Sequence, residues 1–100
     1  MRDEIDDVGV WLTLDELSRA LAVSPDWVTE RVAAGLIEVP SAGASASPAG
    51  WRFDAVIVRR VRSMVRTERC FDAAPELAAL VADLEDQIAQ LRARLARLQP

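Results

Sequence analysis

The chain has 100 residues, of which 51% are hydrophobic, and it carries a formal net charge of −4. This length fits one domain with a modest core. The sequence contains no histidine and a single cysteine, Cys70. This excludes histidine-based acid-base catalysis, Ser-His and Cys-His nucleophile pairs, an intrachain disulfide and the usual zinc ligand sets. We therefore expect a protein that is not an enzyme and that needs no cofactor and no metal.

The distribution of charged and apolar residues indicates the cellular compartment of the protein and the kind of partner that it can bind. No apolar run approaches the roughly 20 residues that span a bilayer, and the acidic start of the chain does not resemble a signal peptide. We expect a cytoplasmic protein without membrane contact. Residues 1–40 hold nine acidic residues against three arginines, whereas residues 51–70 hold six arginines against two acidic residues. The first block should repel polyanions and attract basic surfaces.

A short helix is predicted after an acidic flexible tail at residues 1–9. Thr13 and Glu16 have the spacing of a capping box, in which each side chain bonds the other residue's backbone N–H. The helix is expected to end near Ala22. Its buried stripe follows the helical repeat and comprises Leu14, Leu17, Ala20 and Leu21.

A second helix should follow a short turn around Val23. Ser24 suits the N-cap and Pro25 the first helical position. Gly35 is expected to end this helix in the left-handed conformation. Val28 and Val32 lie one turn apart and should face the core. Together the two helices predict a helix-turn-helix unit.

A two-stranded wing is predicted next. Residues 36–39 and 51–53 have strand character, and residues 41–50 form a loop rich in serine, alanine and glycine. Residues 10–12 could be another short strand or an irregular lead into the first helix. Trp11, Trp51 and Phe53 are expected in the core or at the base of the wing.

A third helix is predicted over residues 55–70, with Asp54 as its N-cap. Its apolar face should comprise Val56, Ile57, Val61, Met64 and Val65. A second face carries arginines at intervals of three and four, namely Arg59, Arg62, Arg66 and Arg69. This arginine stripe could pair with the acidic N-terminal block, form salt bridges across a dimer, or contact an anion, an acidic partner or DNA. Cys70 is expected to be a small hydrophobic residue between this helix and the next.

A fourth helix, opened by Pro75, carries a heptad repeat. Val81, Ile88 and Leu95 occupy the a positions, and Leu77, Leu84, Leu91 and Leu98 the d positions. These residue types favour a two-stranded coiled coil, so residues 75–100 are predicted to form a homodimer. The alternative is that the helix folds back on its own domain.

The order of these elements resembles the MerR-like winged helix-turn-helix domain. The similarity rests on residues 12–17, 35–37 and 50–54. Within that superfamily the chain resembles the CbpM family of chaperone modulators over residues 11–98. The most telling stretches are 51–54 leading into 57–61, and 83–88 leading into 91–95. The resemblance implies a mainly α fold with a head at residues 10–74 and a coiled-coil dimerisation helix at 75–100.

The resemblance also implies a function. CbpM-like proteins bind the J-domain of a DnaJ-like co-chaperone, CbpA, and block its engagement with the Hsp70 chaperone DnaK. The second helix of a J-domain is basic, so an acidic head could occupy it. The a and d residues favour a parallel dimer, whereas the MerR-like resemblance implies an antiparallel one. The candidate contacts to the J-domain are Asp15, Glu16, Asp26, Trp27 and Glu30.

The alternative is a MerR-like transcriptional regulator. Its second helix would enter the major groove and present Ser24, Asp26, Trp27, Thr29, Glu30 and Arg31. One arginine beside two acidic residues is a poor match to a phosphate backbone. We therefore expect protein binding rather than DNA binding.

Overall fold

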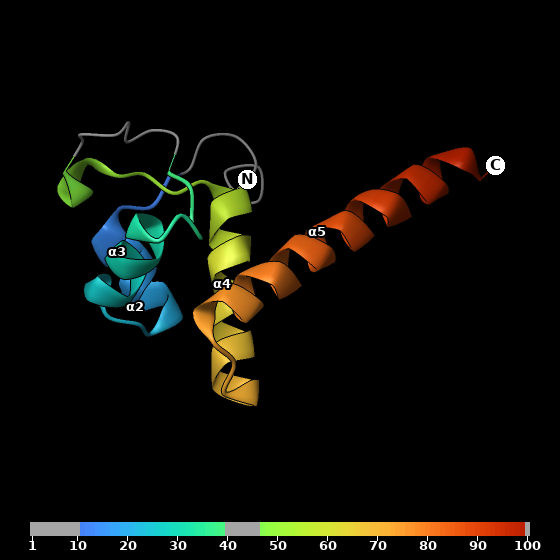
Figure 1. The fold of residues 1–100 in the computed structure, drawn as a ribbon. Coiled ribbons are helices and arrows are strands. Elements are labelled where there is room, and N and C mark those ends of the chain that lie inside the picture. Colours follow the sequence, from blue (N-terminus) through green and yellow to red (C-terminus); the bar gives the residue numbers. More distant parts are fainter. Residues whose placement is uncertain (1–10, 40–46, 100) are drawn as a thin grey trace.

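The computed structural model describes residues 11–39 and 47–99. In these residues it contains four α-helices, α2 (Leu14–Leu21), α3 (Pro25–Ala33), α4 (Ala55–Phe71) and α5 (Pro75–Leu98), and a short 3-10 turn, η1 (Pro48–Gly50). The prediction of a mainly α protein is confirmed. In Figure 1, α2 and α3 lie together on one side of α4, while α5 crosses α4 and then extends away from the other helices. The predicted acidic tail and most of the serine-rich loop lie outside the described residues.

The predicted helix starts are confirmed in atomic detail. The Thr13 hydroxyl accepts from the backbone N–H of Glu16 at 3.1 Å, and the Glu16 carboxylate accepts from the Thr13 N–H at 2.8 Å. Ser24 and Asp54 each accept from the backbone N–H three residues onward, at 3.1 and 2.9 Å. Each cap satisfies N–H groups that the first helical turn leaves unpaired. Gly35 follows α3 at φ +80°, in the expected left-handed conformation.

The predicted two-stranded wing is not found in the described residues. Residues 36–39 form no strand, because the N–H groups of Leu36 and Ile37 bond back to the Arg31 carbonyl at the end of α3. The 51–53 segment instead pairs with the lead into α2. Leu12 and Phe53 form an isolated antiparallel bridge with two backbone hydrogen bonds of 2.9 Å. This bridge joins the start of α2 to the start of α4.

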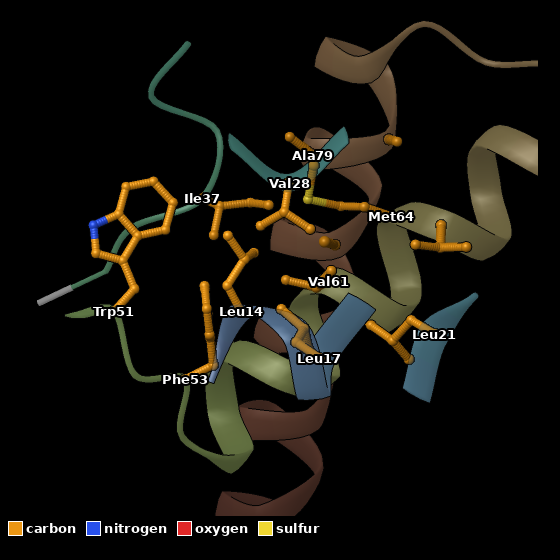
Figure 2. Close-up of a cluster of buried hydrophobic side chains, with 13 residues drawn as sticks. Leu14, Leu17, Leu21, Val28, Ile37, Trp51, Phe53, Val61, Met64 and Ala79 are labelled. Carbon is orange, nitrogen blue, oxygen red and sulfur yellow. The ribbon is translucent and has the colours of Figure 1, made fainter. Parts of the chain in front are cut away.

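One hydrophobic core unites the helices (Figure 2). Leu17, Val28, Phe53, Val61 and Met64 are all 0% exposed. Full burial of such a side chain stabilises the fold by about 1.5–3 kcal/mol. The other buried apolar residues come from α2, α4 and α5 and from residues 37 and 51, and they are Leu14, Leu21, Ile37, Trp51, Val65, Ala78, Ala79 and Ala82.

Four residues that we expected in buried positions are exposed. Trp11 is 44% exposed because successive side chains of an extended segment point to opposite sides, and Leu12 is the one packed on the core. Val56 is 59% exposed and lies on the same side of α4 as the arginines. Ala20 and Cys70 are also exposed. The buried stripe of α2 includes Ser18 instead of Ala20.

Candidate functional site

The exposed surface of α2 and α3 is dominated by carboxylates. Asp15, Glu16, Asp26 and Glu30 are all exposed, as their assignment to a binding face requires. The first three lie in the first turns of their helices, where the helix dipole favours negative charge. Glu16 is committed to the capping box, so it is less free than the others to meet a partner.

Arg31, which we expected at the surface of α3, is instead largely withdrawn from solvent in an ion pair with α4. Its guanidinium donates two hydrogen bonds to Glu68, at 2.8 and 3.0 Å, and the two side chains are 12% and 14% exposed. A third bond of 3.1 Å goes to the Trp27 carbonyl. Such a bidentate pair fixes both partners in orientation. The pair therefore locks α3 against α4.

Trp27 completes this cluster. Its indole N–H donates to Glu68 at 3.3 Å, and the Arg31 guanidinium lies over the ring, 3.9 Å from its centroid. The side chain of Trp27 is partly buried. Since its polar atom is already bonded, the exposed part of Trp27 can offer a partner only an apolar surface.

The burial of Arg31 changes the charge that α2 and α3 present. Arg19 is the only exposed arginine on these two helices. The same two helices carry the four exposed carboxylates. DNA binding needs several cationic contacts to phosphates, and this surface supplies one. In contrast, the surface is suited to a positively charged protein.

Six of the seven heptad positions of α5 are exposed. Leu77, Leu84, Ile88, Leu91, Leu95 and Leu98, together with Leu80, are between 47% and 81% exposed. We call these seven residues the leucine stripe. Val81 is partly buried, and the alanines at 78, 79 and 82 form the contact with α4. Contiguous exposed apolar residues of this kind are typical of interaction surfaces.

The predicted arginine stripe divides into two parts. Arg59, Arg62 and Arg66 line a groove of about 380 Å³ between α4 and α5. Arg66 pairs with Glu85 of α5 at 3.3 Å. Arg69 lies outside the groove and donates to the Ala22 carbonyl after α2. The first reading of the stripe, pairing with acidic residues of residues 1–40, therefore does not describe Arg66 or Arg69.

Arg60 was not among the predicted site residues, yet it organises this region. It donates to the Leu36 carbonyl at 3.1 Å and forms an ion pair with Asp83 of α5. Arg60 thereby ties residues 36–39, α4 and α5 together. Nothing in the local sequence distinguishes it from its arginine neighbours, because its partners lie more than 20 residues away.

Comparison with protein-family models, curated proteins and solved structures yields no significant match. Within residues 11–39 and 47–99, no helix is long and apolar enough to cross a membrane. The same ranges contain no group of three or more acidic or cysteine side chains arranged to hold a metal ion.

Proposed function

We propose that this protein is a non-enzymatic, cytoplasmic modulator of a DnaJ- or CbpA-type co-chaperone. Its acidic α2–α3 face binds the basic J-domain and competes with Hsp70 for it. The observation that carries the proposal is the charge of that face, where exposed carboxylates remain while Arg31 is withdrawn into its pair with Glu68. The specific partner rests on the CbpM-like resemblance of the sequence.

The α2–α3 face combines the two elements that a competitive inhibitor of this kind needs. The carboxylates of Asp15, Asp26 and Glu30 steer a cationic helix and raise the association rate. The exposed part of Trp27 supplies apolar area, and aromatic anchors often carry much of the binding energy at interfaces. Trp27 is also held rigid by Glu68 and Arg31, which lowers the entropy lost on binding.

Dimerisation through the leucine stripe is the second part of the proposal. An α-helix with one exposed apolar stripe is covered most simply by the same stripe of a second copy, as in a coiled coil. The acidic residues of α5 lie in its first half, Glu76 to Asp86, and the three arginines in its second half, Arg92 to Arg97. An antiparallel pair brings opposite charges together, whereas a parallel pair brings like charges together.

The orientation can be measured as a distance. In a chain with Cys70→Ser and Gln99→Cys, spin labels on two antiparallel helices would be about 33 Å apart, because the leucine stripe runs from Leu77 to Leu98 and each residue of the helix rises about 1.5 Å. A parallel pair would place the two labels side by side. Electron double resonance distinguishes these distances, and a short distance would rule out the antiparallel arrangement.

DNA binding in the manner of a MerR-like regulator is the second candidate function. It is favoured by one observation: Arg59 and Arg62 are exposed and have no hydrogen bond or ion pair within residues 11–39 and 47–99. These arginines lie on α4 and not on α3, the helix that would read base edges. A regulator would show binding to duplex DNA that falls steeply with salt and is lost in Arg59→Gln with Arg62→Gln.

The test of the main proposal is association with a J-domain protein from the same source. Asp26→Lys with Glu30→Lys reverses the local charge and should slow association at least about tenfold at low salt. A matched control, Glu38→Lys with Glu76→Lys, makes the same change in net charge outside α2 and α3 and should have little effect. Stopped-flow or surface-based kinetics gives the rates. The proposal fails if calorimetry at low salt detects no complex, and the assigned face is wrong if both double variants behave alike.

A further inference from the structure

The groove between α4 and α5 is lined by more positively charged than negatively charged side chains. Its α4 side carries Arg59, Arg60, Arg62 and Arg66, while its α5 side carries only Glu85 and Asp86. Arg60 is paired with Asp83, and Arg66 with Glu85. Arg59 and Arg62 remain exposed with no partner in the part of the chain that the structure describes. Asp86 offsets one of these two positive charges, so the groove keeps a net positive charge that suits an anionic ligand.

The lining of the groove also includes apolar side chains, which a ligand would contact. Val56 is 59% exposed on the α4 side, and Ala82 and Ala89 line the α5 side. The residues of the leucine stripe are not part of the lining, so the groove and the proposed dimer contact use different residues of α5. A ligand that matches both features is an acidic peptide with an aliphatic side chain among its carboxylates.

We propose that residues 3–7 of this same chain, Asp-Glu-Ile-Asp-Asp, bind in the groove between α4 and α5. The segment carries four carboxylates around one aliphatic residue, Ile5, which is the chemistry that the groove requires. The carboxylates pair with Arg59 and Arg62, and Ile5 contacts Val56. This contact would also shield the arginines from nucleic acid and other polyanions.

The connection to the rest of the chain makes this contact feasible. The backbone bridge from Leu12 to Phe53 fixes the chain beside the start of α4, two residues before Ala55. Arg59 lies about 9 Å along the helix from Phe53, given a rise of 1.5 Å per residue. Residue 7 can extend about 17 Å from Leu12, and residue 3 about 30 Å. A tether of this length holds the segment at a millimolar effective concentration.

Paramagnetic relaxation tests the proposal directly. A spin label is placed at Arg2→Cys in the full chain carrying Cys70→Ser, and the broadening of amide signals is measured at low salt. We expect residues 56–66 and 82–89 to broaden more than 91–98. The excess should vanish when the four acidic residues of 3–7 are replaced by amides. It should also vanish in Arg59→Gln with Arg62→Gln, but persist in the matched control Arg94→Gln with Arg97→Gln.

Three outcomes would overturn the proposal. One is equal broadening in the acidic and amide chains, and another is broadening confined to residues 47–53. The third is broadening seen only when labelled and isotope-enriched chains are mixed, which would place the segment on a second copy. The readout uses the chain alone, so it is independent of whether the protein binds a J-domain.

Discussion

The leucines of α2 and the leucines of α5 have opposite environments in the same molecule. Leu14, Leu17 and Leu21 are at most 9% exposed, because α3, α4 and residue 53 cover them. The leucine stripe of α5 is uncovered, although it follows an equally regular helical repeat. α5 makes its intramolecular contact through the small side chains of alanines instead. An amphipathic pattern therefore does not by itself show whether the rest of the same chain covers the apolar face of a helix.

The largest expected difference between the leucines of α2 and those of α5 concerns the association of two copies of the chain. Leu84→Gln with Leu91→Gln removes four leucines from each proposed dimer, at about 1.5–3 kcal/mol each. Sedimentation should show a monomer at concentrations where the parent chain is a dimer. The matched control, Ala93→Gln with Ala96→Gln, changes two alanines outside the leucine stripe and should stay dimeric. A parent chain that is already monomeric at high concentration would contradict the dimer proposal.

The next effect concerns the covered leucines. Leu17→Ala should lower the free energy of unfolding by about 2–5 kcal/mol, because the side chain is fully buried and leaves a cavity. Leu98→Ala, at 81% exposure in the parent chain, should change the unfolding of a dilute sample by less than about 0.5 kcal/mol. Urea denaturation followed by tryptophan fluorescence measures both. Equal losses would mean that α5 is covered in solution by its own chain.

The smallest expected effects are the losses of stability when either of two ion pairs of α4 is removed. Glu68→Gln weakens a bidentate pair that is nearly buried and should cost about 1–3 kcal/mol. Arg66→Gln breaks the pair with Glu85, in which the two side chains are 54% and 46% exposed, and should cost less than about 1 kcal/mol. Thermal unfolding should rank the two variants in this order. The reverse order would show that the α3–α4 lock is less important than the geometry indicates.

The local features of this fold were predictable from the sequence, whereas its long-range pairings were not. Thr13, Ser24, Asp54 and Gly35 act on residues within one helical turn, so their types and spacing predicted the helix ends. The bridge from Leu12 to Phe53 and the pair of Arg31 with Glu68 join residues 41 and 37 positions apart. No local pattern selects Phe53 over residues 36–39 as the pairing partner, and the predicted wing was therefore not found.

The candidate site shows the same limit. The exposure of Asp15, Asp26 and Glu30 could be predicted, because charged residues on the polar face of a helix face water. The loss of Arg31 from that surface could not, since it depends on where Glu68 of α4 lies. Likewise, the alanines of α5 have a helical spacing as regular as that of its leucines. Only the three-dimensional contact with α4 shows that the alanines face the head.

The alanine contact between α4 and α5 also fixes the orientation of the head around the axis of α5. Small side chains let the two helices approach closely, so the head is fixed rigidly to the first turns of α5. In a dimer held by the later turns, the direction in which each head points then depends on the number of residues between Ala82 and Leu91. Inserting a single residue there would turn each head by about 100° around the helix axis. The number of residues in this short stretch therefore determines the angle between the two heads of a dimer. That angle decides whether both heads can bind one partner molecule or whether each binds a separate one.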